Sequence, residues 1–148
     1  MFDRIVIPTD GSDHAEAAAD DAIELAGEHD ASLHVVSVAD TGPFGGVRLP
    51  GEAKSAKDAI RGRAEKFVER IASRAAESPI DVTTAVLSGP PGSEILEYAE
   101  TIDADLIVMG SRGRGGFHRM AVGSVADHVI RFGDVRVLVV TEPDEGDA

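Results

Sequence analysis

The sequence predicts one α/β domain in which a parallel sheet is covered by helices on both faces. Short apolar runs rich in β-branched residues alternate with stretches whose apolar residues recur at helical spacing. A chain of 148 residues with 43% hydrophobic residues also suits one domain with a real core. We therefore expect the domain to span residues 1–141 and the acidic tail, residues 142–148, to be frayed.

The expected strands are short segments rich in apolar and β-branched residues, and the first of them has the nearly continuous apolar run that is typical of a strand buried on both faces. They are Asp3 to Pro8, Leu33 to Ala39, Asp81 to Leu87, Leu106 to Met109 and Val135 to Val140.

The expected helices carry apolar residues three and four positions apart. They run from Ser12 or Asp13 to about His29, from about Lys54 to Glu77, from a cap at Ser93 through Ile102, and from Ser124 through Ile130. The segment Asp40 to Gly51 is rich in glycine and proline and is predicted to be a loop.

Charge narrows the range of functions. The chain has 27 Asp and Glu against 14 Lys and Arg, a net charge of -13, so a phosphate backbone would be repelled and general nucleic-acid binding is disfavoured. Among the basic residues arginine far outnumbers lysine. Such an acidic, lysine-poor surface fits adaptation to a salt-rich cytosol, or an ordinary acidic surface that aids solubility.

Several classes of site are absent from the sequence. The chain has no cysteine, which excludes disulfides, thiolate nucleophiles and cysteine metal sites. No apolar run approaches the ~20 residues that cross a bilayer, and the N-terminus does not resemble a signal peptide, so we expect a cytoplasmic protein without a membrane partner. It also lacks a P-loop, a G-x-S-x-G elbow and a G-x-G-x-x-G loop.

One segment stands out by its charge. No acidic residue lies between Asp105 and Asp127, whereas three arginines and five glycines do, and the segment runs into the predicted helix at Ser124. Glycines let backbone N–H groups approach an anion closely, and a helix N-terminus offers unpaired donors. The segment is therefore a candidate polyphosphate cradle, the alternative being a connecting loop whose arginines face solvent.

The same segment resembles the signature of the universal stress protein family, Gly-x2-Gly-x9-Gly-Ser/Thr. Here the signature residues are Gly110, Gly113, Gly123 and Ser124. The runs IVIPTDGSDHA, LHVVSV and VRVLVV resemble the family's first, second and last strands. The resemblance covers the chain apart from residues 40–55 and the tail, and it implies five parallel strands in the order 3-2-1-4-5.

The resemblance further implies that the chain binds ATP, or another adenine nucleotide. The residues that it assigns to the nucleotide are Pro8, Thr9, Asp10, Val38, Met109, Gly110, Arg112, Gly113, Gly123, Ser124 and Val125.

According to the resemblance, different residues of this set would contact different parts of the nucleotide. The signature residues and the N–H of Val125 would hold ribose and phosphates, with Arg112 as a charge partner. Pro8, Thr9 and Asp10 would line the nucleoside pocket, and Asp10 could accept from ribose hydroxyls or reach a phosphate-bound Mg²⁺. The main chain of Val38 would meet adenine, and Met109 would pack beside the sugar or base.

Several of these residues also have structural explanations. Asp10 suits a tight turn before glycine, Val38 and Met109 suit the core, and Ser124 stands in the S-x-x-D pattern of a helix cap. We also expect His34, which alternates with core residues, to be a hydrogen-bonded structural group.

The function expected from the sequence is a nucleotide-dependent switch or sensor in stress response. No strong general base adjoins a nucleophile, so we nominate no catalytic residue and expect at most slow ATP hydrolysis. The alternatives are a nucleotide-free dimeric interaction module and a genuine ATPase or nucleotidyl-transfer enzyme. The resemblance also implies a homodimer formed through Val135 to Val140, an apolar edge that needs covering. The sequence names no downstream protein.

Overall fold

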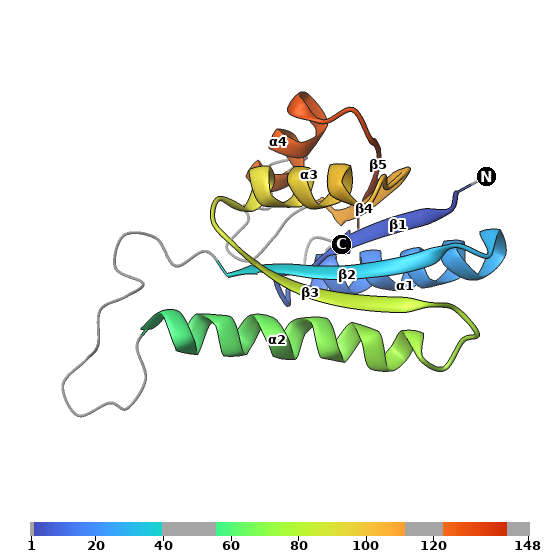
Figure 1. The fold of residues 1–148 in the computed structure, drawn as a ribbon, viewed down its shortest axis with the longest axis horizontal. Helices are drawn as coiled ribbons and strands as arrows, with labels where there is room; N and C mark the ends of the chain where they lie inside the picture. The colour runs from blue at the N-terminus through green and yellow to red at the C-terminus, as the bar shows by residue number, and fades with distance from the viewer. Residues whose placement is uncertain (1, 40–55, 112–122, 142–148) are drawn as a thin grey trace, which may run out of the picture.

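The computed structural model describes residues 2–39, 56–111 and 123–141. It confirms the α/β class: five parallel strands form one sheet in the order β3-β2-β1-β4-β5 (Figure 1). The predicted loop at residues 40–51 and the predicted tail at residues 142–148 lie outside the described residues.

The elements lie close to the predicted segments. The strands are β1 (Arg4–Pro8), β2 (Ser32–Ala39), β3 (Val82–Ser88), β4 (Leu106–Gly110) and β5 (Arg136–Val140). The helices are α1 (Asp13–His29), α2 (Ala56–Ala75), α3 (Pro91–Thr101) and α4 (Ser124–Phe132).

The helices form a layer on each face of the sheet. Helices α1 and α2 cover one face, and α3 and α4 cover the other (Figure 1). Successive strand residues point to opposite faces, so Ile5 and Ile7 pack under α1 and α2, whereas Val6 packs under α3 and α4. A parallel sheet covered twice in this way has two cores, which explains why the central strands β1 and β4 are apolar and buried along most of their length.

Helix α1 is well defined at both ends. Ser12 caps its N-terminus by accepting a hydrogen bond from Ala15 N at 3.2 Å. At the other end Asp30 adopts the left-handed conformation, with φ of 55°, and its N–H returns to the carbonyl of Ala26. The buried face of α1 consists of alanines, whose small side chains let the helix approach the sheet closely.

One predicted helix cap is wrong. Helix α3 begins at Pro91 and not after Ser93, because proline has no N–H to lose and a φ that already suits the first helical turn. Helix α4 begins at Ser124, as predicted, but its N-cap is Gly123, so the alternative in which Ser124 caps the helix does not hold. Helix α2 ends at Ala75 rather than Glu77.

The strands end at different heights. The last residue of β1, Pro8, pairs with Val36, whereas β2 continues to Ala39 beside β3. The carboxyl end of β2 therefore extends beyond the carboxyl end of β1, and Val38 lies in the part of β2 that extends beyond it. In the described part of the chain, no helix is long and apolar enough to cross a membrane.

Candidate functional site at the carboxyl ends of β1, β2 and β4

The strand order reverses between β1 and β4, which are neighbours in the sheet: β2 and β3 are added on one side of β1, and β4 and β5 on the other. From β1 the chain passes to α1 on one face, and β4 precedes α4 on the opposite face. Ligands of open α/β sheets bind at such a switch point, beyond the carboxyl ends of the strands. The fold thus brings Pro8, Thr9 and Asp10 to the same edge as Met109 and Gly110.

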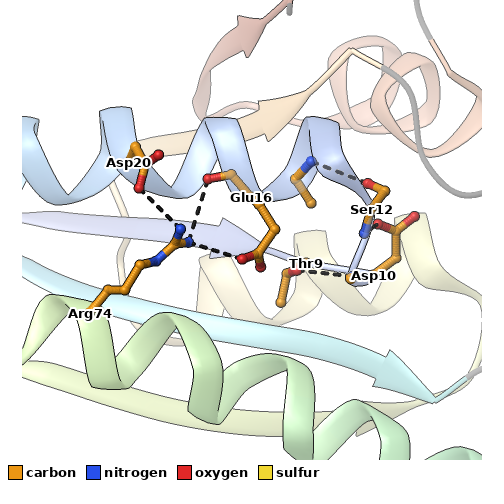
Figure 2. Close-up of polar contacts among 8 residues, drawn as sticks. Thr9, Asp10, Ser12, Glu16, Asp20 and Arg74 are labelled. Atoms are coloured by element: carbon orange, nitrogen blue, oxygen red, sulfur yellow. Dashed lines mark hydrogen bonds and ion pairs between the residues drawn. The ribbon is translucent and has the colours of Figure 1, made fainter.

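The turn after β1 is fixed by hydrogen bonds of its own (Figure 2). Thr9 N donates to Val36 O at 2.8 Å, and Gly11 N donates to Thr9 Oγ1 at 3.1 Å. Ser12 N donates to Asp10 Oδ1 at 3.0 Å, which is the turn role that the sequence offered as the alternative for Asp10. This role is compatible with ligand binding, because a carboxylate accepts several hydrogen bonds.

Gly11 must be glycine for two reasons. Its φ is +80°, a conformation that side chains with a Cβ rarely adopt. A Cβ there would also lie 2.5 Å from the ring of Phe67 on α2. The Asp10 turn therefore packs directly against α2, a contact that the sequence analysis did not predict.

Gly110, the first signature glycine, lies against α1. A Cβ on Gly110 would be 2.7 Å from the carbonyl carbon of His14. Glycine is thus needed for close packing of β4 on α1, whether or not a ligand is bound. His14 had no assigned role in the sequence analysis, and nothing in its spacing pointed to this contact.

The two ends of the signature segment meet at Ser111. Ser111 N donates to Val140 O at 2.9 Å, and Gly123 N donates to Ser111 O. Ser111 is buried, and it stands at a position that the signature leaves variable. These bonds hold the start of α4 beside the end of β4, so Gly110 and Ser124 lie near each other at the same end of the sheet. Arg112 and Gly113 lie outside the described residues.

The start of α4 adjoins the start of α3. Gly92 packs so closely on His128 that a Cβ there would lie 2.5 Å from its ring. The two helix starts border a hollow of about 220 Å³ lined by Pro90, Pro91, Gly92, Ser93, Ser124, Val125 and His128. Because the N-cap Gly123 has no side chain, it provides no side-chain hydrogen bond to the first N–H groups of α4. Such N–H groups at a helix N-terminus are the donors that an anion would use.

The remaining predicted residues lie in the core under α3 and α4. Met109 is buried there, beside Val6 and Ala126, so packing explains its side chain. Val38 and Val125 are partly buried against the same cluster. Their side chains serve the core, and a ligand would meet Val38 and Val125 through backbone groups.

Comparison with known proteins identifies the family. The model of the universal stress protein family matches residues 1–141. The chain belongs to the universal stress protein family. The match covers the whole sheet and both layers of helices. It also includes all the residues described above at the carboxyl ends of the strands.

Individual relatives agree with this assignment. Universal stress protein MJ0531 of Methanocaldococcus jannaschii is 38% identical over 143 residues, which cover 97% of this chain and 84% of the relative. A solved structure of the hypothetical protein MJ0577, described as a structure-based assignment of biochemical function, matches with a TM-score of 0.85 and 26% identity, over 98% of this chain and 99% of that one. A solved universal stress protein in complex with cAMP matches with a TM-score of 0.70 and 25% identity, over 94% of this chain and 97% of that one.

Proposed function

We propose that this universal stress protein binds an adenine nucleotide, with ATP as the expected ligand, and acts as a nucleotide-dependent switch. The observation that carries the proposal is the convergence of the Asp10 turn, Gly110 and the start of α4 at one switch point of the sheet. The solved relative in complex with cAMP supports an adenine nucleotide as the ligand class.

Each part of the ligand has a chemical match at this edge. In this proposal the N–H groups of Ser124 and Val125, in the first turn of α4, bind phosphate oxygens, since the N-terminus of a helix favours anions. Asp10 accepts from ribose hydroxyls, and the backbone of Val38 pairs with adenine. Arg112 and Gly113, which follow β4 and Ser111 in the sequence, complete the phosphate site in this proposal.

A magnesium ion fits the same arrangement. Mg²⁺ is usually held by one or two carboxylates together with phosphate oxygens, and Asp10 supplies one carboxylate. The chemistry that the ion supplies is neutralisation of phosphate charge. Asp10 would then serve the ion, the ribose or both.

The proposal is a switch rather than an efficient enzyme. Its mechanism is a population shift: a nucleotide that binds one conformation better than another raises the share of that conformation, which a downstream protein reads. ATP hydrolysis is at most slow. A Mg²⁺-dependent turnover above ~1 per second would instead favour the ATPase alternative.

We also propose that the protein forms a homodimer through β5. This strand is the last in the sheet order, and the side chain of Leu138 on it is 39% exposed. Helix α4 beside it exposes Ile130 and Phe132 at 48% and 69%. A second copy would cover this edge and these apolar side chains.

The decisive experiment identifies the ligand directly. The purified protein is denatured in molar salt, and any released small molecule is identified by chromatography. The emptied protein is then titrated with ATP and Mg²⁺ by calorimetry, with cAMP and AMP as alternatives and GTP as the control. Binding of an adenine nucleotide near one per chain supports the proposal. Absence of both a released nucleotide and a heat of binding would favour the nucleotide-free interaction module.

A further inference from the structure

Helix α2 is joined to the start of α1 by one arginine. Arg74 places its guanidinium 3.3 Å from Glu16 Oε1 and 3.3 Å from Asp20 Oδ1 (Figure 2). It also donates to the backbone carbonyl of Glu16 at 3.5 Å. One side chain of α2 thus contacts the first two turns of α1 at three points.

A second contact of α2 lies two helical turns away. Phe67 precedes Arg74 by seven residues, so the two side chains lie on the same side of α2. The ring of Phe67 occupies the space where a Cβ on Gly11 would be. Helix α2 therefore contacts α1 through Arg74 and contacts the Asp10 turn, just before α1, through Phe67.

A contribution to folding stability alone does not explain why Arg74 makes these contacts with α1. The side chains of Arg74 and Asp20 are 35% and 66% exposed, and exposed ion pairs contribute little to folding. Glu16 is 20% exposed, and the cost of desolvating a more buried ion pair offsets much of its Coulomb attraction. Two atoms of the cluster, Glu16 Oε2 and Arg74 Nε, are buried and find no hydrogen-bond partner among the residues that the structure describes. A polar cluster with unpaired buried atoms stabilises the fold poorly, but it still fixes the orientation of the groups that carry it.

The orientation fixed here is that of the candidate nucleotide site. Asp10, Gly11 and Ser12 are connected to α1 by the cap hydrogen bond from Ala15 N to Ser12 Oγ. A rotation of the first turns of α1 would therefore move the Asp10 carboxylate relative to Gly110 and α4. We propose that Arg74 is a positioning residue for the nucleotide site: it locks the first turns of α1 to α2 and so holds Asp10 where the ligand needs it. This inference rests on the proposed nucleotide-binding function.

The test compares Arg74→Met with Arg61→Met. Methionine keeps most of the apolar stem of arginine but removes the charge and the donors. Arg61 lies on the same helix and pairs with Glu65 at 3.9 Å in an exposed contact, so its variant controls for the loss of an ordinary surface ion pair. A third variant, Arg74→Lys, keeps the charge without the planar fork.

Three quantities are measured for each variant: the Kd for ATP with Mg²⁺, the thermal midpoint, and amide hydrogen exchange at Gly11, Ser12 and Ala15. For Arg74→Met we expect a Kd about three- to tenfold higher, the range typical of coupling through a contact network. Exchange at the three amides should be about tenfold faster, because local opening of the turn becomes easier. Arg74→Lys should be intermediate, and Arg61→Met should match the wild type.

The outcomes separate this inference from the function on which it rests. A lower thermal midpoint with unchanged Kd and unchanged exchange at the turn would overturn the positioning role, since a purely structural residue behaves in that way. Wild-type protein that binds no adenine nucleotide would overturn the proposed function, and with it the role of Arg74 in ligand binding. Hydrogen exchange would still decide in that case whether Arg74 orders the turn. If Arg74→Met does not fold, Arg74→Lys and Glu16→Gln provide the same comparison.

Discussion

The hydroxyl of Tyr98 on α3 lies 3.0 Å from Nδ1 of His34 on β2. The other ring nitrogen of His34 lies 3.4 Å from Ser32 Oγ, which itself donates to the carbonyl of Asp3 at 3.4 Å. Because the serine hydroxyl donates onward, the chain of bonds is consistent with an Nε2–H on His34 and a Tyr98 hydroxyl that donates to Nδ1. His34 is thus the hydrogen-bonded structural group that the sequence predicted.

This pair predicts a stability that depends on pH. Burial, and then the charge of Arg4, lower the pKa of His34 below its ordinary value of 6.5. The unfolded chain therefore binds the proton first, and the free energy of unfolding should fall as the pH drops below about 6.5. The decrease should end once the pH passes below the lowered pKa of the folded state. Thermal midpoints between pH 7.5 and 5, measured for the wild type and for His34→Gln, would show a smaller decrease in the variant. Equal decreases would mean that His34 does not contribute.

Gly110 and Gly27 provide a matched pair of glycine substitutions. A Cβ on Gly110 would lie 2.7 Å from the carbonyl carbon of His14, whereas nothing lies within 4 Å of a Cβ on Gly27 in α1. We expect Gly110→Ala to lower the free energy of unfolding by about 1–3 kcal/mol through overpacking. Gly27→Ala should raise it by about 0.5–1 kcal/mol, because alanine favours a helix. Denaturant unfolding measures both, and a neutral Gly110→Ala would show that α1 can move aside.

Asp10→Asn separates the two roles of Asp10. The asparagine oxygen can still accept the N–H of Ser12, so the turn and the fold should be kept. Loss of the charge should weaken binding of ATP with Mg²⁺ by about tenfold, since hydrogen bonds to charged groups contribute more than neutral ones. Asp13→Asn, at the exposed first position of α1, is the control. Calorimetric affinities equal to the wild type would restrict Asp10 to its turn role.

Leu138→Arg tests the proposed dimer. A charge at the centre of an apolar contact would be buried without a partner, so the variant should be monomeric where the wild type is dimeric. Thr83→Arg is the control, because Thr83 is exposed on β3 at the opposite edge of the sheet. Sedimentation equilibrium gives the mass of each. A Leu138→Arg dimer, or a wild-type monomer, would contradict the assignment.

Salt should stabilise this acidic chain if its surface is adapted to salt. The screening length falls from ~10 Å at 0.1 M to ~3 Å at 1 M, which weakens repulsion among the carboxylates. Thermal midpoints should therefore rise with KCl concentration. Replacing the exposed acids Asp21, Glu24 and Glu28 of α1 with their amides should reduce that rise. An equal response in both proteins would favour the ordinary acidic surface.

The fold could be predicted because its signals are local. Apolar runs such as LIVMG, and the alanines of α1 at helical spacing, specify strand and helix without reference to the rest of the chain. The resemblance then supplied the strand order, which periodicity does not contain. The first residue of a helix was harder to predict, because proline and serine near a turn are both common at helix starts. Which of them begins α3 depends on the backbone conformation of the turn before it.

The nucleotide site stays a prediction, although the structure places several of its proposed residues together. Asp10, Gly110 and the start of the last helix, which the family resemblance grouped, lie at one end of the sheet. The sequence analysis missed the contacts that Ser111, His14 and Phe67 make in this region. These residues matter through contacts with residues far away in the sequence, and such contacts leave no periodic signal.

The sequence by itself determined the class of fold and the burial of the central strands β1 and β4, and it predicted which segment is most suited to an anion, since these depend on residue type and spacing. Only the tertiary structure decided which face each helix covers and how the ends of the signature segment meet at Ser111. It also decided that Arg74 joins α2 to α1 and that Phe67 occupies the space beside Gly11. The physical reason is that close packing couples residues from separate elements, and their distances exist only once the layers have come together.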